Sequence, residues 1–87
     1  MNKLVKLEIG PGQQKISPDW ITVGDFTRPG VVDHVLSWGK DVLPIDSNSI
    51  DLVYASHCLE HVPWHRVDFA LREVYRVLRP GATFEVH

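Results

Sequence analysis

Cysteine is almost absent from this sequence: Cys58 stands alone, which excludes an internal disulfide and is typical of a reducing compartment. No apolar run approaches the roughly 20 residues that a membrane-spanning helix needs. Residues 1–6 lack the apolar core and cleavage site of a secretory signal peptide. The formal net charge is −2 and the basic residues form no run, which argues against a nucleic acid or a membrane surface as partner. These absences predict a soluble, cytoplasmic protein.

The length of 87 residues allows one small domain. A domain of this size buries only about two-thirds of the surface of its unfolded chain, so its margin of stability is thin. We found no repeat, linker or low-complexity tract. The sequence therefore predicts a single domain over residues 1–87.

Short β-prone runs separated by turn residues dominate the chain. The first ends at Gly10-Pro11-Gly12, which neither a helix nor a strand continues through. Residues 11–19 are too few for an ordinary crossover helix, because parallel strands usually need a dozen or more connecting residues. The predicted strands are Leu4–Ile9, Trp20–Val23, the second half of Val31–Trp38, Asp51–Ser56 and Ala82–Val86.

One long helix is predicted over Trp64–Arg79, ended by Pro80-Gly81. Asp68 and Arg72 have the spacing of an exposed ion pair, and Trp64 and Tyr75 are expected to be packing residues. Apolar residues recur at spacings of three and four and predict one buried face: Val67, Ala70, Leu71, Val74, Val77 and Leu78.

A strand, a long helix and another strand in succession indicate a parallel α/β sheet. We therefore expect a small sheet of about five strands with one long helix and shortened crossovers. A parallel sheet needs apolar cover on both faces, and one helix covers only one. The other face is expected to be thinly covered, or covered by a second chain.

The glycine turn and a later acid are the first candidates for a binding site. Glycines directly after a strand let the backbone approach a ligand, and ligands of parallel sheets bind beyond the carboxyl ends of the strands. Asp25, at the end of the second strand, is placed to accept hydrogen bonds from a ribose. A plain Gly-Pro-Gly turn and a solvated aspartate are an equal alternative, because short glycine motifs often match by chance.

Four segments, in order, resemble the class I, Rossmann-like methyltransferases that use S-adenosyl-L-methionine. The stretch Trp20–Val23 also resembles a branch of that family with a shortened first crossover. Relative to the family pattern the sequence is truncated after the fifth strand. The four segments are Leu7-Glu-Ile-Gly-Pro-Gly12, Leu43-Pro-Ile-Asp-Ser-Asn-Ser-Ile-Asp-Leu-Val-Tyr54, Ser56-His-Cys-Leu-Glu-His-Val62 and Leu71-Arg-Glu-Val-Tyr-Arg-Val-Leu-Arg-Pro-Gly81.

The resemblance implies a cofactor, S-adenosyl-L-methionine, and a set of residues around it. In such enzymes the protein mainly aligns a nucleophile with the methyl group. His57 or His61 could serve as a base where the nucleophile carries a proton, since histidine is suited to proton transfer near neutral pH. The implied cofactor-binding residues are Glu8, Gly10, Pro11 and Gly12 at the methionine end, Asp25 with Phe26 at the ribose, Ser37 and Trp38 at the adenine, and Ser56 and His57 at the substrate entrance.

Departures from the family pattern keep other functions open. Gln14 replaces a third glycine, Gly24 intervenes before Asp25, and Ser37 replaces the usual acid. A non-catalytic cofactor-binding or partner subunit is therefore the main alternative to a small methyltransferase with an unidentified acceptor. A nicotinamide-dependent oxidoreductase is a third hypothesis, which the segments around residues 43–48 and 59–61 argue against. The exposed edge of the last strand favours a homo-oligomer, most simply a dimer.

Histidines four residues apart raise the question of a metal. His57, His61 and His65 would face one side of an unbroken helix, with Cys58 and Glu60 nearby. Pro63 is expected to break that helix, so no metal site is predicted. His61 and Glu60 could equally be structural, Trp38 could equally be a core aromatic, and Cys58 is expected to fill space.

Overall fold

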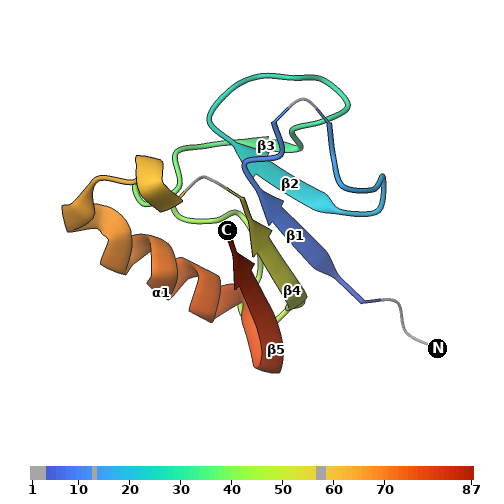
Figure 1. The fold of residues 1–87 in the computed structure, drawn as a ribbon. Coiled ribbons are helices and arrows are strands. Elements are labelled where there is room, and N and C mark those ends of the chain that lie inside the picture. The colour runs from blue at the N-terminus through green and yellow to red at the C-terminus, as the bar shows by residue number, and fades with distance from the viewer. Residues whose placement is uncertain (1–3, 13, 57–58) are drawn as a thin grey trace.

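The computed structural model describes residues 4–12, 14–56 and 59–87, and it shows one parallel sheet with a helix packed on it (Figure 1). His57 and Cys58 lie outside the described residues. The elements, in chain order, are β1 (Lys6–Ile9), β2 (Ile21–Gly24), β3 (His34–Val35), β4 (Ile50–Ala55), the 3-10 turns η1 (Leu59–His61) and η2 (Trp64–Arg66), α1 (Val67–Val77) and β5 (Leu78–Val86).

The five strands are all parallel and lie in the order β3-β2-β1-β4-β5. The chain first builds outward from β1 to β3, then returns to place β4 on the other side of β1. This reversal makes the ends of β1 and β4 the switch point at which parallel sheets bind ligands. The predicted fold class, a Rossmann-like sheet of five strands with one long helix and shortened crossovers, is confirmed.

The core lies between α1 and one face of the sheet. Strand residues alternate between faces, so Leu7 and Val53, which are paired in register, point to the same side and are fully buried. Val74 and Val77 of α1 meet them there without solvent exposure. Leu43, just before β4, is also buried and extends this cluster toward the loop that leads into the sheet.

The opposite face of the sheet is polar and aromatic. The register aligns Thr22, Glu8, Tyr54 and Glu85 in one row across four strands. Trp20 covers part of this row, with its ring edge-on to Tyr54 at a centroid separation of 6.4 Å. Within the described residues this face is covered by loops and side chains, whereas α1 covers the other, as expected for a sheet with one long helix.

The helix is shorter than the sequence predicts at both ends. Residues 64–66 form a 3-10 turn, and the helix ends at Val77 instead of Arg79. Pro80 lacks the N–H that would bond to the carbonyl of Arg76, and the amide of Asn48 donates to that carbonyl at 2.9 Å instead. The amide of Ser49 likewise donates to Val77 O at 2.8 Å. The last carbonyls of α1 are thus satisfied by the loop before β4.

The last strand begins at Leu78, four residues earlier than predicted. It contains Pro80-Gly81, and the register with β4 shifts between Ile50 and Leu52. Gly81 takes a positive φ of 82° there, which is how one strand accommodates extra residues opposite its neighbour. Pro80-Gly81, which was predicted to end the helix, therefore forms an irregularity within β5.

Several local expectations are confirmed and two are wrong. Asp68 and Arg72 form the predicted ion pair at 2.9 Å on the outside of α1. Trp64 and Tyr75, expected to pack, are 88% and 79% exposed. The helix stripe is centred on Ala70, Val74 and Val77, with the charged Glu73 buried among them.

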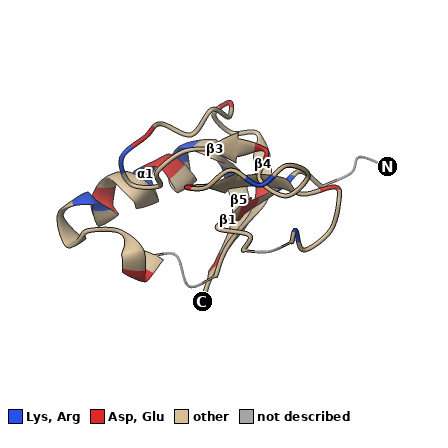
Figure 2. Cartoon of the chain, turned by 90° about the horizontal axis from the view of Figure 1, so that it is seen from above, with Lys and Arg blue, Asp and Glu red and all other residues tan. Residues whose placement is uncertain are grey.

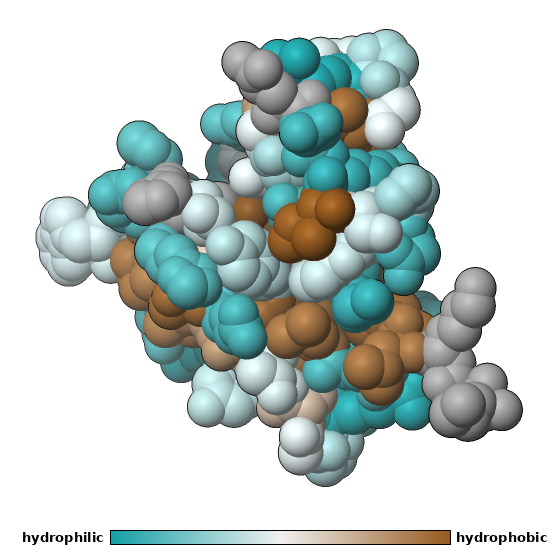
Figure 3. Space-filling model, turned by 45° about the vertical axis from the view of Figure 1, so that its right-hand side comes forward, coloured by the Kyte–Doolittle hydropathy of each residue, from teal (hydrophilic) through white to brown (hydrophobic). Residues whose placement is uncertain are grey.

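Figures 2 and 3 show how charged and hydrophobic residues are distributed in two views of the molecule. Figure 2 shows acidic and basic residues interspersed along α1 and the loops. On the face drawn in Figure 3, hydrophobic residues form separate areas between hydrophilic ones. In the part of the chain that the structure describes, no helix is both long and apolar enough to cross a bilayer.

Candidate functional site

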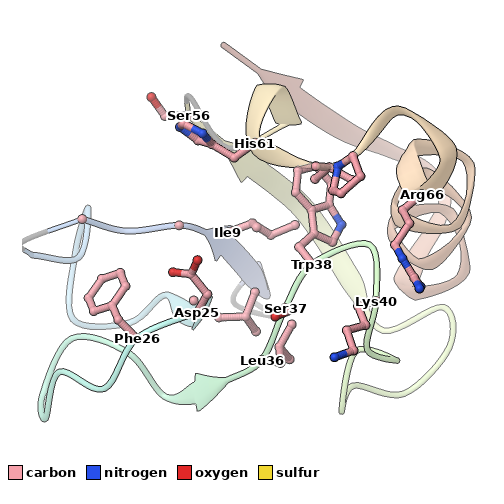
Figure 4. Close-up of a pocket in the computed structure, with 16 residues that line it drawn as sticks. Ile9, Asp25, Phe26, Leu36, Ser37, Trp38, Lys40, Ser56, His61 and Arg66 are labelled. Atoms are coloured by element: carbon pink, nitrogen blue, oxygen red, sulfur yellow. The ribbon is translucent and has the colours of Figure 1, made fainter.

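A cavity of about 560 Å³ opens where β1, β2 and β4 end (Figure 4). Ile9 and Val23, the last inward-facing residues of β1 and β2, form part of its apolar lining. The cavity lies at the carboxyl end of the sheet, beside the point where the strand order reverses. It is therefore where a parallel α/β sheet is expected to hold a ligand.

The glycine turn borders this cavity with its backbone. Gly10 and Gly12 both take positive φ values, 72° and 73°. A Cβ added at Gly12 would meet no atom within 4 Å, so the turn leaves open space above its backbone. The amide of Gly10 donates to Val23 O at 2.8 Å, which fixes the turn against β2. The turn can thus approach a ligand without a side chain in between.

Asp25 and Phe26 follow β2 and line the cavity next to the glycine turn. The Asp25 side chain is exposed, whereas Phe26 is half-buried. The guanidinium carbon of Arg28 lies 5.5 Å from the centre of the Phe26 ring, a cation–π contact. A carboxylate beside an aromatic ring presents an acceptor and an apolar surface to one ligand.

A second side of the cavity is formed by residues 36–40, which we call the 36–40 wall. Leu36, Ser37 and Trp38 all line it. The indole N–H of Trp38 donates to Ala70 O in α1 at 3.1 Å, and the amide of Ser37 donates to the Asp41 carboxylate at 2.8 Å. Trp38 also packs partly against the core, so it is both a core aromatic and a cavity residue.

The remaining side comes from the end of β4 and the turns that follow it. Ser56 and His61 lie on the same side of the cavity in Figure 4. Lys40 and Arg66 lie at the opposite end from Asp25 and Phe26. The cavity therefore has an acid at one end and two cations at the other.

Glu8, which the resemblance implied at the methionine end of the cofactor, lies behind the glycine turn in β1. It is only 5% exposed and points to the polar face of the sheet, and it is not among the cavity-lining residues. Its Oε1 accepts the amide of Ile16 at 3.1 Å. Burial raises the pKa of this carboxyl, which the Ile16 amide and the charge of Lys15 oppose. Glu8 thus holds the loop after the glycine turn.

Most of the other predicted residues converge on the cavity. Pro11 is adjacent to it without lining it, and His57 lies outside the described residues. The predicted residues that do line the cavity are Gly10, Gly12, Asp25, Phe26, Ser37, Trp38, Ser56 and His61.

Sequence reasoning missed about half of the lining. Ile9 and Val23 carried a usable signal, because each is the last inward residue of a predicted strand. Gly24 and Leu36 are direct neighbours of the predicted residues Asp25 and Ser37. The other four carried no motif: Lys40, Val62, Pro63 and Arg66.

His61 and His65, the two histidines of the series that the structure describes, lie in two separate 3-10 turns. Pro63 is extended (φ −53°, ψ 139°) and separates η1 from η2, so the predicted break is confirmed. Among residues 4–12, 14–56 and 59–87, no group of three potential metal ligands comes together.

This geometry agrees with the comparisons to known proteins. The family model described as a methyltransferase domain matches residues 15–86, and the chain belongs to that family. The match begins after the glycine turn. The chain is also 28% identical over 87 residues to the sterol 4-C-methyltransferase strm-1 of Caenorhabditis elegans. That alignment covers 98% of this chain but only 24% of the nematode protein, so the chain spans about a quarter of its relative.

Proposed function

We propose that residues 1–87 form one domain that binds S-adenosyl-L-methionine in this cavity and serves methyl transfer. The observation that carries the proposal is the convergence of the glycine turn, Asp25 and Trp38 on one cavity at the switch point of the sheet. Membership of the methyltransferase-domain family supports it.

The lining residues fit the parts of this cofactor. The cavity volume lies within the roughly 300–1,000 Å³ of small-molecule sites. Both carboxylate oxygens of Asp25 can accept hydrogen bonds from a ribose diol. Leu36 and Trp38 offer apolar surface to an adenine ring, and the open backbone at Gly12 leaves room for the methionine end.

The chemistry follows from positioning. Bound S-adenosyl-L-methionine supplies an activated methyl group, so the chain itself needs to orient and shield the reacting groups. His61, exposed at the cavity and following β4, is our proposed proton acceptor for a protonated nucleophile. His57 keeps this role only as a prediction from the sequence.

The methyl acceptor is not identified. The nematode relative is named for a sterol, so a sterol is the first acceptor to test, followed by small polar molecules. We also propose that the chain self-associates, most simply as a dimer through β5, which ends the strand order on one side and leaves Val86 46% exposed. A cytoplasmic location stays a prediction of the sequence.

Calorimetric titration with S-adenosyl-L-methionine tests the proposal directly. We expect the wild-type chain to bind and Asp25→Ala to bind about tenfold or more weakly, because hydrogen bonds to a charged group contribute about 1.5–3 kcal/mol each. Asp68→Ala, which removes an exposed acid on the outside of α1, is the matched control and should bind like wild type. In the same titration His61→Gln should retain binding, and in a separate methyl-transfer assay, with a sterol as the first acceptor, it should lose about a hundredfold in rate. A folded wild-type chain that binds no cofactor, or equal affinity in Asp25→Ala, would contradict the proposal.

A further inference from the structure

The 36–40 wall rests directly on α1. Besides the hydrogen bond from the Trp38 indole to Ala70, the backbone of Gly39 lies close to Ala70 of α1 and to Val62, which lies between η1 and η2. A Cβ added at Gly39 would lie 2.7 Å from a methyl carbon of Val62 and 3.6 Å from Cβ of Ala70, and its φ is 94°. The wall is thus in close contact with its support, and a small displacement of either would change the cavity.

Two side chains of α1 hold the chain that follows this wall. Glu73 accepts the amide of Leu43 at 2.8 Å. Arg76 donates to the carbonyls of Leu43 and Ile45, each at 2.9 Å, and to the hydroxyl of Ser47 at 3.1 Å. Together they bind residues 43–47 at four points, beginning only three residues after the 36–40 wall ends.

The two side chains also bind each other in a fixed geometry. Arg76 Nε lies 2.9 Å from Glu73 Oε2, and Nη2 lies 3.0 Å from Oε1. Glu73 is 8% exposed, and the hydrogen bond from Arg76 lowers the pKa of its carboxyl. A planar guanidinium in a two-point contact is rigid in a way that a lysine ammonium is not.

We propose that Glu73 and Arg76 are positioning residues of the cofactor site, which hold the 36–40 wall at the distance that the nucleoside end of the ligand requires. The inference rests on the proposed function for the identity of the ligand. Neither side chain lines the cavity, so both act through residues 43–47 and the wall.

A purely structural role makes a different prediction. If Glu73 and Arg76 only stabilised the fold, substituting them would affect the whole core evenly. If they position the 36–40 wall, substituting them moves this wall before the rest of the core. The chain has three tryptophans, and only Trp38 lies in this wall. Trp20 covers the opposite face of the sheet, and Trp64 is exposed in η2.

The test uses the chain labelled with 5-fluorotryptophan, with the Trp38 resonance assigned by Trp38→Phe. Arg76→Lys keeps the positive charge and removes the planar guanidinium that makes the two-point contact. Glu73→Gln keeps an oxygen that accepts the Leu43 amide and removes the negative charge. In both we expect the Trp38 fluorine signal to shift or broaden in the free protein, well below its unfolding temperature, with the other two signals unchanged. Affinity for S-adenosylhomocysteine should fall about tenfold, because the displaced wall no longer lies where the nucleoside end of the ligand requires it. Arg72→Lys, in the exposed pair with Asp68 on the same helix, is the matched control.

Each outcome decides the question. Unchanged Trp38 signals and unchanged affinity in both variants would overturn the inference, and so would equal movement of all three signals. If wild type binds no S-adenosylhomocysteine, the proposed function fails, and the Trp38 signal alone decides whether Glu73 and Arg76 position the wall.

Discussion

At the scale of single residues, Glu8 and Glu73 are two buried carboxyls with opposite surroundings. Glu73 faces the guanidinium of Arg76, whose hydrogen bond lowers its pKa. Glu8 accepts one backbone amide and has Lys15 nearby, but burial dominates and raises its pKa. The charged form of Glu73 therefore stabilises the fold. Burial disfavours the charged form of Glu8, although its carboxyl accepts the amide of Ile16.

The raised pKa of Glu8 predicts a pH-dependent effect of Glu8→Gln. Between the ordinary value of 4.5 and the higher folded value, the native chain binds more protons than the unfolded chain. Stability contributed by this group is therefore present below 4.5 and is lost as pH rises through the folded pKa. We expect Glu8→Gln to gain in free energy of unfolding relative to wild type as pH rises from 4 to 7, measured by urea titration. Asp25→Asn, at an exposed carboxyl, is the control. If the difference in free energy of unfolding between Glu8→Gln and wild type did not change with pH, the assignment would be refuted.

Residue patterns predicted the acid at Asp25 and the glycine turn because both are short-range signals. They did not predict the burial of Glu73, since the apolar spacing that predicts the buried face of the helix includes only apolar residues such as Ala70 and Val74. The partners of Glu73 and Arg76 lie about 30 residues away, and no local pattern reports such a contact. Alternation along β1 places Glu8 on the opposite face of the sheet from Leu7 and Ile9, whereas the role of Glu8 at the cofactor was implied by the family resemblance alone.

At the scale of elements, the loop before β4 and the end of α1 form one unit. Asn48 takes a positive φ of 56° so that its amide, followed by that of Ser49, reaches the last carbonyls of the helix. This long-range cap explains why the helix stops at Val77. The sequence predicted the existence of both elements, but the boundary depended on a contact that periodicity does not encode.

The conformation of Asn48 gives a matched pair of variants. Asn48→Gly retains the amide and permits the positive φ, so its stability should stay within about 0.5 kcal/mol of wild type. Asn48→Val retains the amide but opposes the left-handed conformation, and should lose about 1–2 kcal/mol. Both values are read from urea unfolding. Equal stability of the two variants would show that backbone conformation at this position does not limit the cap.

At the scale of the whole molecule, the sheet has one helix-covered face and two outer strands of unequal length. β5 has nine residues and β3 only two. Longer free edges pair more readily with other strands, so the proposed self-association is assigned to β5. The sequence predicted the approximate number of strands and their parallel orientation, because strand–helix–strand succession constrains topology. It did not predict the order of the strands or which edge strand is longer.

Sedimentation equilibrium tests the dimer through its mass. Wild type should approach twice the chain mass of 9.9 kDa as concentration rises. Val86→Lys places a charge on β5, and should shift the chain toward monomer. Val35→Lys does the same on β3, at the opposite edge where the side chain is 55% exposed, and should leave the mass unchanged. A monomer at every concentration, or the reverse response of the two variants, would contradict this arrangement.

The shared cap between α1 and the loop before β4 also constrains how such a chain can vary in length. An extra residue between Leu43 and Ser49 would break one of two sets of hydrogen bonds. These are the bonds from the Asn48 and Ser49 amides to the last carbonyls of α1, and the bonds from Arg76 to the carbonyls of the loop. An extra turn of helix would push the same loop aside. Insertions and deletions in related sequences should therefore avoid this stretch and gather around Arg28 and Gly30, where the chain is exposed and a Cβ added at Gly30 would meet open space.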